Sequence, residues 1–312
     1  MRIVIALGGN AMTGADGSAH PEDQRAAVRR ASGPIADLVA AGHDVMLTHG
    51  NGPQVGNILV KNELAAAVVP PVPLSWCGAQ TQATIGMMLM NFLDAALAER
   101  GVDKRTATLV SRTLVDRGDP AFENRTKPIG RYLGREEAQR LMAHGEHFVE
   151  IPDKGWRRVV ASPEPLECLD APAADLLLAQ GYVVVSSGGG GIPTVRNEDG
   201  LLEGVEAVID KDLTAALIAG GVGADFLVIA TDVENVVAGW GTPDARPVHE
   251  VDAGAMRVIA AEERFAAGSM GPKVEAVTRF AERSGGTGVI TSLDLLSEAV
   301  AGTAGTRVVP TP

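Results

Sequence analysis

The chain has 312 residues, enough for two lobes or for one large α/β domain with a sizeable core. Because only 4% of the residues are aromatic, Val, Ile, Leu and Ala must fill most of that core. The net charge of −12 opposes nonspecific binding to nucleic acid or to anionic membranes, so an anionic substrate requires a local cluster of Lys or Arg.

The first part of the chain alternates strand-like and helix-like patterns. Apolar runs predict strands, and apolar residues at helical spacing predict the helices between them. The expected elements are a strand at 2–7, a helix at 21–41, a strand at 44–48, helices after Pro53 and at 79–100, and a strand at 106–110. This βαβα order predicts an α/β fold with an open, mainly parallel sheet sandwiched by helices.

Residues 112–165 differ in character from the segments on either side. They are charged and interrupted by prolines, with weak periodicity, which predicts a lid or small subdomain inserted over the sheet edge. The Arg157-Arg158 pair inside this stretch could bind an anion or belong to a solvated strand face. Regular alternation then returns, with a helix expected at 173–180, strands at 182–186 and 226–230, a helix at 272–283 and a closing strand around 289–290.

No segment has the pattern of an export signal or a membrane span. The sequence opens with a strand-like run, and no apolar stretch approaches the ~18 residues of a spanning helix. The two cysteines, Cys77 and Cys168, lack CxxC or Cys/His spacing. We therefore expect a cytoplasmic protein with two reduced, structural thiols.

Two glycine-asparagine turns end the first two strands. Gly8-Gly9-Asn10 follows the strand at 2–7, and Gly50-Asn51-Gly52 follows the strand at 44–48. Ligands of open α/β sheets bind beyond the carboxyl ends of the strands, and glycines let the backbone N–H groups approach an anion. The turns therefore predict a phosphate or carboxylate clamp, unless Gly and Asn merely supply positive φ in tight connections.

Three further glycine-rich or helix-opening segments occur in the second half. They are Gly188 to Gly191, Asp210-Lys211-Asp212, and Gly268 to Lys273. Neither GxGxxG nor GxxxxGK[ST] occurs, which disfavours a Rossmann dehydrogenase and a P-loop NTPase. Lys211 and Lys273 each stand near a predicted helix start, where an ammonium and backbone N–H groups could meet phosphate together. The alternative is that both are solvated surface lysines.

Other candidate residues carry an open alternative. His49 stands in the second turn as a hydrogen-bonding structural residue or as a base. Thr231-Asp232-Val233 follows the strand at 226–230, where it could contact a nucleotide or form a simple Asx turn. Met87, Met88 and Met90 could form a subunit surface, although a core stripe explains Met88 equally well.

Taken together and in order, these segments resemble carbamate kinases, a branch of the amino acid kinase superfamily. The motifs that carry the resemblance are 6–11 (ALGGNA), 48–56 (THGNGPQVG), 126–130 (TKPIG), 188–193 (GGGGIP), 204–212 (GVEAVIDKD) and 268–273 (GSMGPK). Two departures fall in the insertion: Arg131-Tyr132 stands where Pro-Phe is expected, and Ala161 where a proline is expected.

The resemblance implies one amino acid kinase domain over 1–312 that transfers phosphoryl groups reversibly between ATP and carbamate. The direction expected in use is ATP formation from carbamoyl phosphate. Residues 1–190 would form the carbamate side, residues 200–312 the nucleotide side, and about 112–165 the lid. Mg²⁺ would be held through nucleotide phosphates and water, without protein ligands, and the enzyme would be a homodimer.

The resemblance also implies roles for individual residues. Gly8, Gly9, Asn10, Gly50, Asn51 and Gly52 would hold carbamate and the transferring phosphoryl group. Lys211 would stabilise the transition-state charge with Asp210 orienting it, and Lys127 would reach the carbamoyl phosphate side. Lys273 would meet the nucleotide phosphates, and Thr231, Asp232, Val233 and Met270 complete the predicted nucleotide side.

Two alternative functions are weighed against this one. The first keeps the fold and phosphorylates another carboxylate, a phosphate or a phosphonate. The second is a silent nucleotide-binding or regulatory protein, which the presence of Lys127, Lys211, Lys273 and Asp210 argues against.

Overall fold

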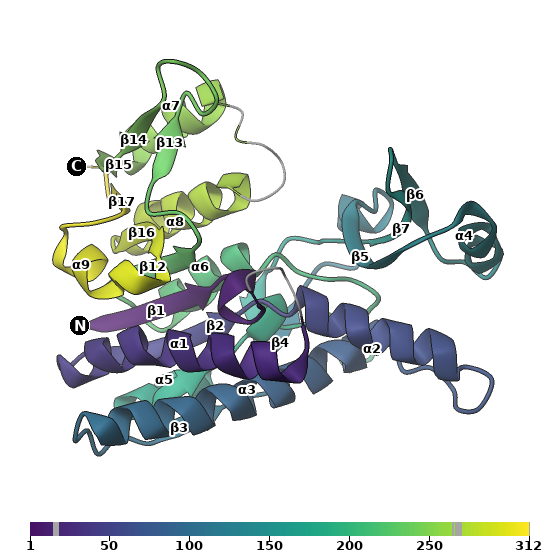
Figure 1. The fold of residues 1–312 in the computed structure, drawn as a ribbon, viewed down its shortest axis with the longest axis horizontal. Helices are drawn as coiled ribbons and strands as arrows, with labels where there is room; N and C mark the ends of the chain where they lie inside the picture. Colours follow the sequence, from purple (N-terminus) through teal and green to yellow (C-terminus); the bar gives the residue numbers. More distant parts are fainter. Residues whose placement is uncertain (15–18, 264, 266–269, 312) are drawn as a thin grey trace.

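The structure is a computed structural model that describes residues 1–14, 19–263, 265 and 270–311. A mainly parallel sheet of eight strands forms its centre, and only β16 and β17 pair antiparallel (Figure 1). In spatial order the strands are β15 (Glu250–Asp252), β17 (Thr306–Val309), β16 (Thr287–Ser292), β12 (Phe226–Thr231), β1 (Arg2–Leu7), β2 (Asp44–His49), β9 (Val183–Val185) and β3 (Thr106–Thr108). The predicted α/β fold with a parallel sheet is confirmed.

Helices cover both faces of this sheet. Successive residues of β1 point to opposite faces, so Ile3, Ile5 and Leu7 pack on one layer and Val4 and Ala6 on the other. The first layer contains α1 (Pro21–Ala40), α3 (Leu74–Glu99) and α9 (Leu296–Ala301). The second contains α5 (Ala171–Ala179), α6 (Lys211–Gly221), α7 (Ala253–Glu263) and α8 (Met270–Ser284).

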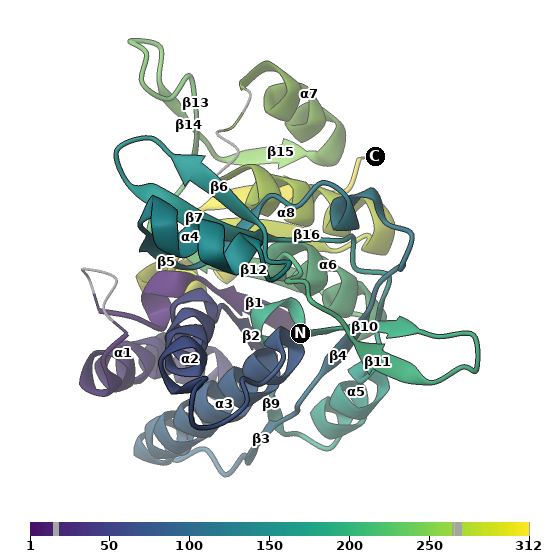
Figure 2. The same cartoon turned by 90° about the vertical axis from the view of Figure 1, so that its right-hand side faces the viewer.

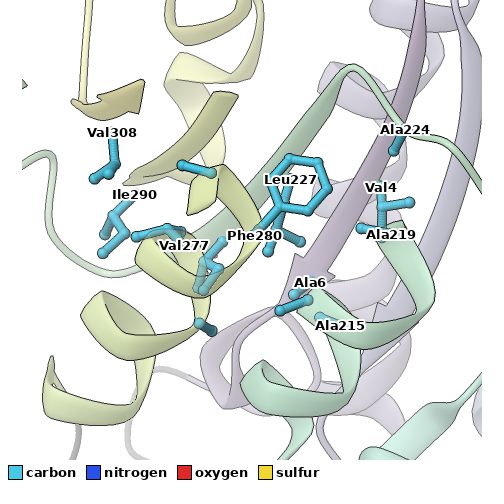
Figure 3. Packing of buried hydrophobic residues seen from close by; sticks show 14 of the residues in the cluster. Val4, Ala6, Ala215, Ala219, Ala224, Leu227, Val277, Phe280, Ile290 and Val308 are labelled. Carbon is cyan, nitrogen blue, oxygen red and sulfur yellow. The ribbon is translucent and has the colours of Figure 1, made fainter. Parts of the chain in front are cut away.

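Aliphatic side chains and the large aromatic ring of Phe280 fill much of the second layer. Figure 3 shows Phe280 of α8 beside Leu227 of β12, with Ala215 and Ala219 of α6 near Val4 and Ala6. The small side chains of Ala215 and Ala219 let α6 approach the sheet closely. The larger side chain of Phe280 fills the space between α8 and the sheet. This packing fixes the start of α6, with its N-cap Asp210 and first residue Lys211, at the carboxyl edge of the sheet.

A second sheet of four strands lies beside the central one. Its strands are, in order, β11 (Leu202–Gly204), β10 (Ile192–Arg196), β4 (Arg112–Leu114) and β8 (Glu167–Cys168). Residues 112–114, predicted as the start of the insertion, thus pair with β10 and β8. The remaining elements of the body are α2 (Gly52–Ala65), the hairpin β13 (Val236–Ala238) and β14 (Arg246–Val248), and the 3-10 turns η1 (Gly9–Ala11), η2 (Pro120–Phe122), η3 (Gly188–Gly190) and η4 (Leu293–Leu295).

A small unit projects from the body above α2 (Figure 1). It consists of β5 (Lys127–Leu133), α4 (Arg135–Met142), β6 (Phe148–Ile151) and β7 (Gly155–Val160), with β7 in the middle of a three-stranded antiparallel sheet. Its own core contains Leu133, Ala138 and Phe148. We call this unit, residues 127–160, the projecting subdomain; Figure 2 shows it in front of the body's sheet.

The remaining sequence expectations concern thiols and membrane spans. Cys77 and Cys168 are free and buried, and burial raises the pKa of Cys168 to about 12. Within the described part of the chain, no helix combines the length and apolar character needed to cross a membrane.

Candidate active site

The two glycine-asparagine turns lie side by side at the carboxyl edge of the central sheet. Strand β1 pairs with β2 on one side and β12 on the other. The chain segments that follow β1 and β12 therefore leave the carboxyl edge of the sheet in opposite directions. Ligands of open α/β sheets bind at such a switch point. The Gly8 N–H donates to Ala230 O at 2.9 Å, and the Gly50 N–H donates to Leu7 O at 3.1 Å. Both turns are therefore anchored to neighbouring strands.

The run Gly188 to Gly191 supports the second turn from beneath. A Cβ on Gly188 would lie 2.3 Å from His49 Nε2, and one on Gly189 would lie 2.2 Å from Asn51 Nδ2. Gly189, Gly190 and Gly191 also have positive φ. This run, grouped in the sequence with ligand-type segments, is needed for close packing against the turn that carries Asn51.

The side chain of Asn51 is oriented by helix α3. Its Nδ2 donates to Thr81 Oγ1 at 2.9 Å, and the Thr81 hydroxyl donates to Gly78 O at 2.7 Å. Because the single hydroxyl hydrogen is used on Gly78, Thr81 can only accept from Asn51, which fixes the direction of the amide. Gln82 on the same helix donates to Gly188 O at 2.9 Å. Sequence analysis missed Thr81 and Gln82, which carry no signal beyond an ordinary helical pattern.

His49 is buried beside the turn and stays neutral near pH 7. Burial lowers its pKa to about 4, although a hydrogen bond to the backbone oxygen of Gly50 opposes this shift. That bond spans 3.0 Å, and because the partner is a carbonyl, Nδ1 is the donor. His49 therefore acts here as a packed, hydrogen-bonding residue.

Three lysines and two aspartates meet the turns from the other side. The Asp210 carboxylate caps α6 by accepting from the Asp212 N–H at 2.9 Å, and it pairs with Lys127 of β5 at 3.1 Å. Burial on its own would raise the pKa of Asp210, but the charge of Lys127, the Asp212 N–H and the charge of Lys211 hold it below its usual value. Lys127 and Asp210, 83 positions apart, are thus joined across the two parts of the molecule.

Asp212 holds the other two lysines. Its carboxylate lies 2.5 Å from Lys211 Nζ and 3.5 Å from Lys273 Nζ, and its side chain is only 5% exposed. The sequence assigned the orientation of Lys211 to Asp210; the structure gives Lys211 its ion pair with Asp212 and gives Asp210 to Lys127. Asp212 was visible in the sequence beside Lys211, but only the fold shows that it also meets Lys273.

One cavity of 690 Å³ contains most of these groups. Its described wall includes Gly9, Gly50, Asn51, Gly52, Gly189, Lys127, Asp210, Lys211, Asp212 and Lys273. The Lys211 stem packs against Gly50, since a Cβ there would lie 3.6 Å from Lys211 Cδ. The sequence therefore predicted side chains and turns that the fold brings to one space.

Some predicted residues lie outside that wall, as far as the structure describes it. Gly8 is pressed against β12, where a Cβ would lie 2.9 Å from Ala230 O and 3.7 Å from Thr231 Cα. Thr231 ends β12 and donates to Asp232 Oδ1 at 3.0 Å, and Val233 follows. Met270 begins α8, while the Asn10 side chain, Gly268 and Ser269 fall outside what the structure describes.

Comparisons with known proteins bear on the family and fold of the chain. The sequence model of the Amino acid kinase family matches residues 1–292. A carbamate kinase of Thermococcus kodakarensis is 43% identical over 312 residues, covering 99% of both chains. The chain belongs to the amino acid kinase family.

Solved structures of amino acid kinases have the same overall fold. A Giardia lamblia carbamate kinase bound to AMP-PNP is 40% identical, with a TM-score of 0.95 over 99% of this chain and 98% of that one. A structure from Aeropyrum pernix is 42% identical, with a TM-score of 0.96 over 100% of both chains. The likeness thus extends over the projecting subdomain as well as the body.

The described cavity wall of this amino acid kinase has more basic than acidic side chains. Among the described residues, the wall carboxylates that face Lys127, Lys211 and Lys273 are Asp210 and Asp212, so this described part of the wall has a net positive charge. Within the described residues, no group of three or more His, Cys, Asp or Glu side chains could hold a metal ion. Such a cavity favours an anionic ligand with several phosphate oxygens.

Proposed function

We propose that the protein is a carbamate kinase that transfers a phosphoryl group reversibly between ATP and carbamate, giving carbamoyl phosphate and ADP. The observation that carries the proposal is the convergence of Lys127, Lys211 and Lys273 on one cavity with the two glycine turns. The 43% identity to a carbamate kinase supports the choice of acceptor.

Carbamate suits a site without a general base. Its attacking oxygen already carries negative charge, so the bond to the γ-phosphorus forms, and the bond to ADP breaks, without removal of a proton. His49, with a pKa of about 4, would remain neutral throughout. The reaction needs alignment and cancellation of charge on crowded oxygens, which lysines and backbone N–H groups provide.

Each lysine is assigned a part in this transfer. Lys211, whose stem packs on Gly50, would stabilise the charge of the transferring phosphoryl group. Lys273 would meet the nucleotide phosphates, and Lys127 the carbamoyl phosphate. Asp212 forms ion pairs with the first two, and Asp210 forms one with the third. Asp210 and Asp212 are thus positioning residues for the lysines.

The two substrates would occupy the two sides of the switch point. Gly8, Gly9, Asn10, Gly50, Asn51 and Gly52 would hold carbamate and the transferring phosphoryl group. Thr231, Asp232, Val233 and Met270, near β12 and α8, would contact ATP or ADP, and the AMP-PNP bound by the Giardia lamblia enzyme supports such a nucleotide site.

Magnesium fits this site as a companion of the nucleotide. Asp210 and Asp212, the wall carboxylates, are both engaged by lysines, so phosphate oxygens and water would hold the ion. When bound, Mg²⁺ neutralises phosphate charge. The protein's own contribution remains the placement of the three ammonium groups and the glycine turns.

The wider setting of the enzyme follows from the same reasoning. We propose a cytoplasmic homodimer that forms ATP from carbamoyl phosphate. Helix α3 exposes Trp76 at 62% and Met87 at 50%, whereas Ile85 and Leu89 are fully buried in the core. An apolar face left on a helix that also packs inward is typical of a subunit contact, and sedimentation of the purified protein would test it.

An acceptor panel tests the proposed activity. Purified protein with ATP and Mg²⁺ would be offered carbamate, acetate, glutamate, phosphate and a phosphonate, and ADP formation would be measured. We expect carbamate to be used far better than the others. Faster ADP formation with a different acceptor would show that the protein is a kinase with another substrate. No transfer to any acceptor would contradict the proposal.

A further inference from the structure

The cavity has one basic wall residue that no described carboxylate neutralises. Among the described residues, five basic side chains line it: Lys127, Arg131, Arg157, Lys211 and Lys273. The three lysines pair with Asp210 or Asp212, and Arg131 pairs with Glu63 at 3.1 Å and Glu137 at 2.7 Å. Arg157 alone has no ion pair among the described residues, so its full charge is available to a ligand.

The projecting subdomain holds the Arg157 guanidinium in place. Arg157 of β7 stands opposite Tyr132 of β5, its Cζ lies 5.0 Å from the centre of the Tyr132 ring, and its Nη1 donates to the Tyr132 hydroxyl at 3.4 Å. Its Nε is buried and has no hydrogen-bond partner in the described structure. The cation–π contact and the hydroxyl thus support the guanidinium without neutralising it.

Arg158, the next residue on the strand, has the opposite surroundings. It pairs with Glu146 at 3.3 Å and Glu206 at 3.4 Å and does not line the described cavity wall. Successive strand residues face opposite sides, so one arginine of the pair serves structure and the other faces the site. The sequence could not tell which of the two descriptions, anion site or solvated face, applied to each residue.

We propose that Arg157 is a substrate ligand that binds the phosphate of carbamoyl phosphate, and that Tyr132 positions it. This inference rests on the proposed function. A guanidinium presents several N–H donors in a planar fork that matches two phosphate oxygens, a geometry that the ammonium groups of the lysines cannot offer. Because Arg157 and Lys127 both belong to the projecting subdomain, that subdomain supplies two cations to the same phosphate.

Tyr132 supplies both a ring and a hydroxyl group to the Arg157 guanidinium. It stands where the resemblance to carbamate kinases leads us to expect phenylalanine, which would keep the ring beneath the guanidinium and lose the hydroxyl. The hydroxyl accepts from Nη1, so it restricts rotation of the guanidinium in the absence of phosphate. Its removal should therefore have a smaller effect than removal of Arg157.

Binding of inorganic phosphate tests the assignment without relying on turnover. We would compare wild type, Arg157→Gln, Arg157→Lys and Tyr132→Phe by calorimetry, with Arg135→Gln as control because Arg135 is 67% exposed and pairs with Glu150 at 3.7 Å on the same subdomain. We expect phosphate affinity to fall about 10- to 100-fold in Arg157→Gln and about 2- to 3-fold in Tyr132→Phe. Arg157→Lys should fall between these two, and Arg135→Gln should bind like wild type.

Kinetics and ADP binding complete the experiment. The KM for carbamoyl phosphate should rise with the phosphate Kd in Arg157→Gln, while ADP affinity and the thermal midpoint stay at the wild-type values. Phosphate affinity and KM unchanged in Arg157→Gln would overturn the assignment, as would equal losses for phosphate and ADP. If wild type forms no ATP from carbamoyl phosphate, the proposed function fails, whereas phosphate binding that depends on Arg157 would still support this ligand.

Discussion

The two walls of the cavity are built from different kinds of interaction. The wall after β1 and β2 consists of backbone turns and the Asn51 amide, with the neutral His49 buried beside them, and neutral hydrogen bonds and glycine contacts fix these groups. The wall from β5, α6 and α8 consists of lysines that share Asp210 and Asp212. The first wall is a shaped cradle, and the second is a set of charges whose partners a phosphate can replace.

Because the walls differ in this way, we expect changes in the first to affect stability and changes in the second to affect catalysis. Changes in the glycine-supported wall should cost folding free energy, because its close contacts leave no room for rearrangement. Changes in the lysine wall should cost transition-state stabilisation, because the affected groups act on charge that develops during transfer. Four variants, at Lys211, Gly189, His49 and Thr81, probe this division, from the largest expected effect to the smallest.

Lys211→Ala tests the charged wall. We expect the variant to lose roughly 2 to 4 kcal/mol of transition-state stabilisation, about the range for removing one preorganised donor, with little change in its urea midpoint. The measurement is kcat/KM for ATP formation. Lys61→Ala on the exposed side of α2 is the matched control, and near wild-type turnover of Lys211→Ala would remove this lysine from the mechanism.

Gly189→Ala tests the supporting wall. Gly189 has φ +65°, and a Cβ there would meet Asn51 Nδ2 at 2.2 Å, so we expect a loss of about 2 to 4 kcal/mol in unfolding free energy by urea denaturation. Gly181→Ala is the control, because φ there is +81° but no atom lies within 4 Å of the new Cβ. Its cost should be only about 1 kcal/mol, and equal costs at both positions would refute the packing argument.

His49→Gln tests whether the buried His49 side chain stays neutral in the folded protein. Because the pKa of His49 falls from 6.5 to about 4 on folding, the folded state resists protonation. The free energy of unfolding therefore has its full value above pH 6.5 and decreases by about 2 to 3 kcal/mol as the pH falls toward 4. Urea denaturation at pH 7 and pH 4.5 should show a smaller loss in His49→Gln than in wild type.

The same variant also reports on mechanism. His49→Gln should keep most of its turnover near pH 7, measured from the carbamoyl phosphate side, since no proton has to leave the acceptor. A folded His49→Gln protein that binds both ligands and yet has no turnover would show that His49 takes part in the chemistry.

Thr81→Val is expected to have the smallest effect. It removes the acceptor that orients Asn51, which should raise the KM for carbamoyl phosphate by a few-fold, equivalent to about 1 kcal/mol. Thr81→Ser should restore it. Thr84→Val is the control, because the Thr84 hydroxyl donates to Gln80 O at 3.0 Å on the exposed side of the same helix; the same KM change in both valine variants would rule out a specific role for Asn51.

The elements predicted best are those whose pattern is local. The apolar run at 2–7 became β1 with the same bounds, and the helix predicted at 21–41 became α1, Pro21–Ala40. Helix α3 begins at Leu74, earlier than the predicted 79, because Pro73 provides its N-cap. The short strands β4, β8 and β11 have at most three residues each, too few to show an alternating pattern.

Several residues of the cavity wall could be named from the sequence, but their contacts could not. Glycine turns after strands and lysines at helix starts are visible in one sequence, since each depends on neighbours along the chain. The pairing of Lys127 with Asp210 and the sharing of Asp212 between Lys211 and Lys273 depend on how distant segments pack. The support given by Thr81 and by Gly189 depends on packing in the same way.

Phosphorus NMR provides the most direct test of the central claim. The claim is that the protein transfers a phosphoryl group between carbamate and ADP, and that the lysines of the cavity wall stabilise this transfer. Wild type and Lys211→Ala would be incubated with carbamoyl phosphate, ADP and Mg²⁺. We expect wild type to convert the carbamoyl phosphate signal into that of the γ-phosphate of ATP, at a rate far above that of Lys211→Ala. Loss of carbamoyl phosphate only to inorganic phosphate, or equal ATP formation by both proteins, would contradict it.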